Sequence, residues 1–102
     1  MAQFDVFRNP RGGIYPLIVD IQADLHARLA TRVVVPLVPR ARYAAQPVTR
    51  LTPVLKILSA DHVVMFPLMA AVSRTALGEV VGSLAAHRAT LIAALDLLVT
   101  GA

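Results

Sequence analysis

Three polar side chains interrupt the apolar stretch from Ile14 to Leu25: Asp20, Gln22 and Asp24. A carboxylate within such a stretch is tolerated only when it is hydrogen-bonded or paired with a cation. We therefore predict one of two roles for Asp20. In the first, it is a structural acid, whose carboxylate accepts hydrogen bonds from a turn or forms an ion pair with an arginine such as Arg32 across the sheet. In the second, with Gln22 and Asp24, it is part of a rim on which a partner docks.

The other residues that could do chemistry do not form a catalytic or metal-binding pattern. The chain has three histidines, His26, His62 and His87. Their surroundings contain no HExxH sequence and no carboxylate at a metal-ligand interval. None of the serines lies in a G-x-S-x-G turn, and the chain has no P-loop and no G-x-G-x-x-G sequence. We therefore expect a protein that is not an enzyme, with no catalytic residue, no metal and no cofactor.

The length and composition predict one small domain that covers residues 1–102. A chain of 102 residues is too short for two independent cores, because small chains bury proportionally less surface. Charged residues interrupt it at short intervals, so no segment approaches the ~20 apolar residues of a membrane helix. The first residues lack a basic leader followed by an apolar segment, and the chain contains no cysteine. These features favour the cytoplasm and exclude disulfides.

Charge and apolar content both indicate partners. The net charge is +4, and nine of the ten cationic residues are arginines, which suits nucleic acid or an acidic peptide. With two Tyr, three Phe and no Trp, the chain has few surfaces on which bases could stack, so we expect no direct sequence-specific binding of nucleic acid. The hydrophobic fraction of 57% exceeds what a small domain can bury alone. We therefore expect a homodimer.

The hydrophobic pattern predicts about five short strands. They cover Phe4–Phe7, Ile14–Leu25, Arg32–Pro39, Pro53–Leu58 and His62–Met69. Pro36 cannot donate a ladder hydrogen bond, so its strand is expected at an edge of the sheet or with a bulge. Residues 8–13 are rich in turn formers, residues 59–61 form a second turn, residues 25–31 form a loop or short helical turn, and residues 39–53 form a basic connector.

A single helix is predicted at the end of the chain, over residues 83–99. Its leucines recur at helical spacing, Ser83 is a suitable N-cap, and Gly101 is a suitable residue just beyond the end. Short strands that are not separated by helices favour an antiparallel sheet rolled into a small barrel. The expected fold is therefore mainly β, with one C-terminal α-helix.

Five blocks of the sequence resemble the CcdB family of plasmid and chromosomal toxins over essentially the whole chain. The blocks are Tyr15-x-Leu17-x-Val19-Asp20-x-Gln22-x-Asp24, Arg32-x-Val34-x-Pro36-Leu37, Leu51-x-Pro53-Val54, Met69-Ala70 and Leu77-Gly78-Glu79. The V-D-x-Q-x-D piece is the most specific of them. The resemblance implies a CcdB/MazF-like fold, an SH3-like antiparallel barrel with a C-terminal helix, assembled as a homodimer in the bacterial cytoplasm.

The resemblance also implies a function. CcdB toxins are non-catalytic poisons that bind the A subunit of DNA gyrase and trap the complex in which DNA is cleaved. A CcdA-like antitoxin with an acidic, disordered C-terminal segment neutralises them. By resemblance, the gyrase-binding residues are Asp96, Val99, Thr100, Gly101 and Ala102. The antitoxin-binding residues, again by resemblance, are Leu25 and His26.

Two alternatives remain open at the level of the sequence. The family closes its terminal helix with Trp-Gly-Ile, whereas this chain ends Thr100-Gly101-Ala102, so the chain could keep the fold without poisoning gyrase. The other alternative is an endoribonuclease of the MazF/Kid kind, which shares the fold. RNA cleavage without a metal would need an arginine, a hydroxyl and a general base in one groove. Arg28, Thr31 and Arg32 are the candidates.

Overall fold

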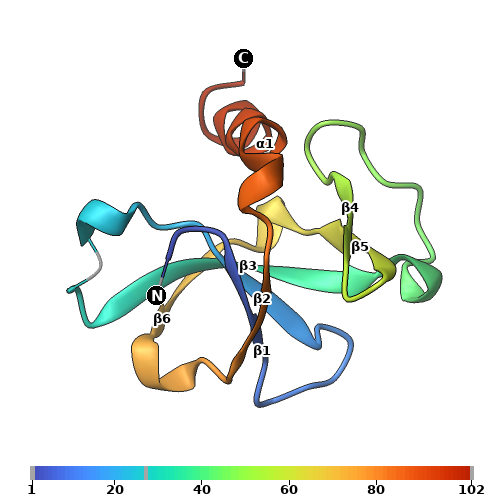
Figure 1. The fold of residues 1–102 in the computed structure, drawn as a ribbon. Helices are drawn as coiled ribbons and strands as arrows, with labels where there is room; N and C mark the ends of the chain where they lie inside the picture. Colours follow the sequence, from blue (N-terminus) through green and yellow to red (C-terminus); the bar gives the residue numbers. More distant parts are fainter. Residues whose placement is uncertain (1, 27, 102) are drawn as a thin grey trace.

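The computed structural model describes residues 2–26 and 28–101 as a curled antiparallel sheet with an α-helix packed against it (Figure 1). The strands are β1 (Asp5–Arg8), β2 (Leu17–Asp20), β3 (Thr31–Pro39), β4 (Val54–Ile57), β5 (Ala60–Val64), β6 (Ala70–Ser73) and β7 (Val80–Ser83), and the helix is α1 (Arg88–Thr100). Short 3-10 helices connect them: η1 (Asp24–His26), η2 (Arg40–Arg42), η3 (Phe66–Leu68), η4 (Arg74–Ala76) and η5 (Ala85–His87).

The strand order within the sheet is β4-β5-β3-β2-β1-β7, and β6 pairs with the first half of β3. Every pairing of the described strands is antiparallel. The curled sheet and the terminal helix confirm the predicted barrel-like, mainly β fold. No helix among the described residues is long and apolar enough to cross a membrane.

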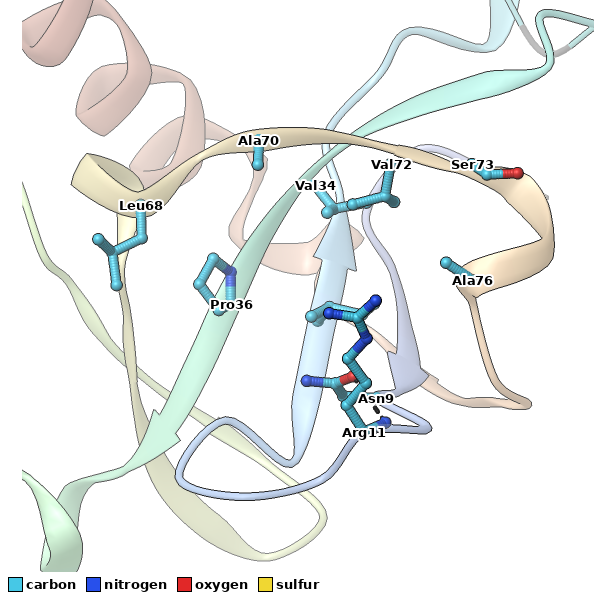
Figure 2. Close-up of a pocket in the computed structure, with 10 residues that line it drawn as sticks. Asn9, Arg11, Val34, Pro36, Leu68, Ala70, Val72, Ser73 and Ala76 are labelled. Carbon is cyan, nitrogen blue, oxygen red and sulfur yellow. Dashed lines mark hydrogen bonds between the residues drawn. The ribbon is translucent and has the colours of Figure 1, made fainter.

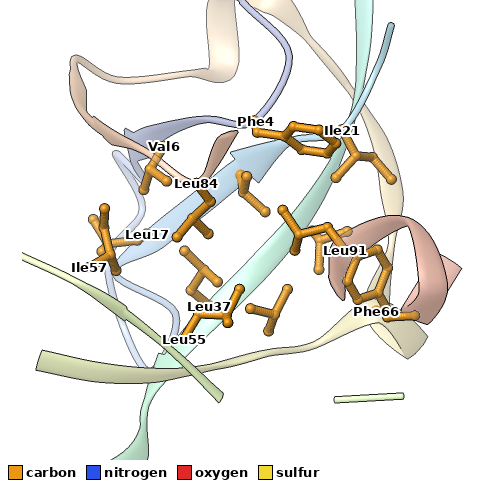
Figure 3. Packing of buried hydrophobic residues seen from close by; sticks show 14 residues of the cluster. Phe4, Val6, Leu17, Ile21, Leu37, Leu55, Ile57, Phe66, Leu84 and Leu91 are labelled. Carbon is orange, nitrogen blue, oxygen red and sulfur yellow. The ribbon is translucent and has the colours of Figure 1, made fainter. Parts of the chain in front are cut away.

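The core lies between the concave side of the sheet and α1 (Figure 3). Alternate residues of each strand point into it, so Leu17 and Val19 of β2 meet Val35 and Leu37 of β3. Leu91 and other apolar residues close the core from the helix side. This alternation places Leu17, Val19 and Ile21 on one face of the strand.

The prediction that Pro36 marks an edge strand or a bulge is wrong. β3 is an inner strand, and its pairing with β2 runs in regular register through Ile18 and Pro36. The carbonyl of Pro36 accepts a hydrogen bond from the Met65 N–H at 3.0 Å, and the nitrogen of a strand residue points to the same side as its carbonyl. That nitrogen therefore faces the gap between β6, which pairs with the first part of β3, and β5, which pairs with its last part. A missing N–H donor is tolerated at this gap.

The helix begins later than predicted, and seven strands form within the described residues instead of about five. Ser83 is the last residue of β7, and its hydroxyl accepts from the Ala85 N–H at 3.1 Å. α1 itself begins at Arg88 and ends at Thr100, and Gly101, which caps this end, takes the left-handed conformation with φ of 75°. The predicted C-terminal glycine is thus confirmed, and the predicted N-cap is wrong.

Two predicted strands are shorter than expected. β2 covers only Leu17–Asp20, because η1 begins at Asp24. The predicted strand over His62–Met69 ends at Val64, after which the chain turns through η3. The turn between β4 and β5 lies at Leu58 and Ser59, whereas the prediction placed it at residues 59–61.

Candidate functional site

A buried ion pair between Asp20 and Arg32 lies beneath the loop that joins β2 to β3. Both side chains have no exposed surface. Arg32 donates from Nε to Asp20 Oδ2 at 2.9 Å. Its Nη2 lies 2.7 Å from the same oxygen, but it is not aligned as a hydrogen-bond donor. The interaction is therefore one charge-assisted hydrogen bond with an additional close charge contact, and it confirms the structural role predicted for Asp20.

The same pair holds the loop above it. The other oxygen of Asp20 accepts from the Gln22 N–H at 2.9 Å. The carbonyl of His26, at the end of η1, accepts from Arg32 Nη1 at 3.1 Å and from Gln22 Nε2 at 3.0 Å. Gln22 also accepts from the Val33 N–H at 3.0 Å. Two polar residues of the V-D-x-Q-x-D block and the arginine thus fix the end of η1 from below.

The third polar residue of the block, Asp24, ties the loop to the N-terminal segment. Its carboxylate accepts from the Gln3 N–H, and the side chain of Gln3 accepts from Arg88 Nη1 at 2.7 Å. Arg88 is the first residue of α1, and its guanidinium stacks over the ring of Phe4 with 5.7 Å to the centroid. The loop is therefore anchored both to the sheet and to the start of the helix.

The anchored loop presents the residues that the resemblance assigns to the antitoxin. Leu25 is 88% exposed, and His26 is exposed beside it. Leu29 adds a third exposed side chain after η1. A leucine that is exposed on this loop has no packing function inside the protomer, so this rim (Leu25, His26 and Leu29) has the features of a contact surface.

The residues assigned to gyrase lie at the far end of α1. Val99 is 67% exposed, and Leu98 and Asp96 are also exposed. Thr100 donates its hydroxyl to the Asp96 carbonyl at 2.7 Å, and the Gly101 N–H bonds to the Leu97 carbonyl at 3.0 Å. These bonds order the last turn. Ala102 lies outside the described residues.

The structure does not merge the two predicted surfaces within one protomer. The rim is anchored at Arg88, the first residue of α1. Val99 lies eleven residues further on, about 17 Å along the helix at 1.5 Å per residue. The contacts of the loop and the exposed end of the helix thus describe two separate surfaces.

A shallow pocket of about 490 Å³ opens on the convex face of the sheet, away from the core (Figure 2). Ile18, Val34 and Pro36 form its floor, since they alternate with the core residues of β2 and β3. Residues of β6 and its flanking turns form one wall, and Arg11 lies at the edge of the pocket. The sequence does not predict this pocket, because the pairing of β3 with β6 has no signal in the hydrophobic pattern.

The residues proposed for RNA cleavage are not assembled. Arg32 is fully buried and paired with Asp20, so it cannot contact RNA. Arg28 and Thr31 are exposed. Among the described residues, no group of three or more His, Cys, Asp or Glu side chains could hold a metal ion. His62 is buried, and its Nδ1 lies 3.0 Å from the Ala60 carbonyl, a local contact.

A comparison with protein families matches residues 3–101 to the CcdB protein family. The search of curated proteins returned no match. The family match covers nearly the whole chain and agrees with the curled sheet and the terminal helix. The chain therefore belongs to the CcdB family, whose members are toxins of toxin–antitoxin systems.

Proposed function

We propose that this protein is a toxin that binds the A subunit of DNA gyrase through the exposed end of α1 and traps the cleaved DNA complex. The observation that carries the proposal is the family match over residues 3–101. The ordered, apolar helix end supports it, because exposed Leu98 and Val99 offer an apolar contact where the family places its target-binding residues. The protein acts by binding and performs no chemistry of its own.

Neutralisation by an antitoxin follows from the same proposal. An acidic, disordered segment of a CcdA-like protein docks on the rim formed by Leu25, His26 and Leu29. The net charge of +4 favours an acidic segment, and coupled folding lets such a segment cover a large surface. The convex pocket suits the same segment, because the floor of the pocket is apolar and Arg11 at the edge of the pocket can pair with a carboxylate.

A homodimer is the third part of the proposal. α1 is apolar around most of its circumference, with Thr90 and Asp96 as the polar residues between Arg88 and Val99. A helix of this kind is expected to be buried on all sides. Within one protomer, however, only Leu91 and Ala94 of the described helix residues are buried. A second copy of the chain would cover part of this remaining surface and leave the C-terminal end of the helix free for gyrase.

The function is tested by a DNA cleavage assay with supercoiled plasmid, ATP and the gyrase of the source organism. We expect linear, cleaved DNA to accumulate when the protein is added. The Val99→Lys variant should need at least tenfold more protein, because a charge at an interface core costs about 1.4 kcal/mol or more. Val80→Lys is the matched control, since Val80 is an exposed valine on β7, and it should behave as the unsubstituted protein.

Other outcomes of this assay lead to other conclusions. No cleavage at micromolar protein would mean that the chain keeps the CcdB fold without poisoning gyrase. Cleavage that both variants reduce equally would move the contact away from the helix end. Degradation of purified RNA by the protein alone would support the endoribonuclease alternative.

A further inference from the structure

We propose that a basic loop beside α1 binds the phosphodiester backbone of duplex DNA without regard to sequence. The basic loop is defined by three arginines, Arg40, Arg42 and Arg50, in the connection between β3 and β4. In Figure 1 this connection is the green segment that stands beside the helix. The proposal goes beyond the toxin function, because it requires neither gyrase nor an antitoxin.

The first observation is the distribution of charge along the chain. The sequence contains no Asp or Glu from Leu25 to Ala60. None of the three arginines of the basic loop has an ion-pair partner among the described residues, whereas Arg8 and Arg32 do. Lys56 also lies in this segment, but it stands opposite Asp61 across the β4–β5 pair, so it does not belong to the basic loop. The loop therefore carries about three uncompensated positive charges.

The second observation is a pocket of about 460 Å³ between this loop and the helix. Arg40 and Arg50 line it from the loop, and Thr90 lines it from α1. Gln46 and Thr49 add further hydrogen-bonding side chains to its wall. Guanidinium, hydroxyl and amide donors that converge on one open pocket match the acceptor oxygens of a phosphate group.

The third observation is that the loop is ordered before any ligand arrives. Thr52 is buried, and its hydroxyl accepts from the Val48 N–H at 2.8 Å and donates to the Val48 carbonyl at 3.1 Å. Arg40 donates from Nη1 to the Tyr43 carbonyl at 3.0 Å, which fixes the direction of its side chain. Arg50 has a φ of 74°. This conformation costs free energy for a residue with a Cβ and persists only where the surrounding structure holds it, which agrees with an ordered loop.

DNA fits this loop better than an acidic peptide does. Arg40 and Arg50 line the pocket, whereas Arg42 is not among its lining residues, so the positive charge extends along the loop beyond one site. A disordered peptide would also lose entropy on binding to it. Duplex DNA is already stiff and carries regularly spaced charges, so ordering costs little. Since no aromatic side chain is among the residues that line this pocket, the bases have no stacking surface, and the contact is to the backbone.

The test is the salt dependence of binding to a fluorescent 25-base-pair duplex, measured by anisotropy with the full chain. For three phosphate contacts, the plot of log affinity against log salt should have a slope of about −2.7, a loss of about 40-fold between 50 and 200 mM salt. The Arg42→Gln/Arg50→Gln variant should keep one contact, so its slope should fall to about −0.9 and its loss to about 3.5-fold. Duplexes of different sequence should bind equally.

The control variant is Arg28→Gln/Arg74→Gln, which removes the same charge from exposed arginines outside the loop. It should keep the slope of the unsubstituted protein, and thermal unfolding should show all three proteins folded. Equal losses in both variants would overturn the proposal in favour of general charge attraction. The absence of binding at 50 mM salt would also overturn it. Displacement of DNA by micromolar pyrophosphate would replace the backbone contact with a closed site for a single small anion.

Discussion

Asp20 illustrates what a single residue reveals in the sequence and what it conceals. An acid in an apolar strand has to be hydrogen-bonded or paired, and this rule made an arginine such as Arg32 a candidate partner. The rule did not reveal that Gln22 and the carbonyl of His26 complete the same network. The hydrogen bonds of a loop depend on its backbone path, and side-chain type does not determine that path. In this chain, the V-D-x-Q-x-D block therefore holds the loop between β2 and β3 through hydrogen bonds.

Replacing Asp20 with asparagine should destabilise the protein by about 3–5 kcal/mol, because it leaves the buried guanidinium of Arg32 without its counter-charge. Urea unfolding followed by circular dichroism measures the loss. Glu79→Gln is the control, since it removes the exposed ion pair between Arg8 and Glu79 and should cost less than about 1 kcal/mol. A loss below about 1 kcal/mol for Asp20→Asn would show that the loop reorganises and hydrates Arg32.

At the scale of elements, the sequence predicted long, patterned segments better than short ones. β3 and the end of α1 lie where the valine run and Gly101 placed them. β6 and β7 have four residues each, and none of their side chains is fully buried. Their strand conformation comes from pairing with β3 and β1, which are distant in sequence. A local pattern contains no information about such partners.

The turn between β4 and β5 offers a stabilising substitution. Leu58 and Ser59 have φ angles of 54° and 64°, the conformation of a two-residue turn that favours Asn-Gly. A residue with a Cβ costs roughly 1 kcal/mol or more in this region. The Leu58→Asn/Ser59→Gly variant should therefore raise the free energy of unfolding by about 1–2 kcal/mol, measured by urea titration.

The control for the turn is Leu58→Ala/Ser59→Ala, which keeps both Cβ atoms and should give no gain. Leu58 is 51% exposed, so its removal sacrifices little buried surface in either variant. An equal gain in the two variants would attribute the effect to the loss of an exposed leucine and not to the turn conformation.

At the scale of the whole molecule, the apolar helix leads to a prediction about assembly. Sedimentation equilibrium should give twice the mass of the chain at micromolar concentration. The Ala93→Glu variant places a charge on the exposed side of α1 and should shift the protein to the mass of one chain, because a buried unpaired charge is costly. Ala45→Glu, in the exposed connection before β4, should leave the mass unchanged. A single-chain mass for the unsubstituted protein would contradict the dimer.

The pairing of β1 with β7 has a consequence for how this chain is made. Val6 pairs with Gly82, so a strand near the start of the chain can form this pairing only after a strand near its end has been synthesised. A ribosome adds about 5–20 residues per second, and contacts between such distant segments form late in folding. α1, which carries the proposed target surface, is synthesised later still. A chain that stops before β7 therefore lacks both the partner of β1 and the helix, so we expect it not to act on the proposed target.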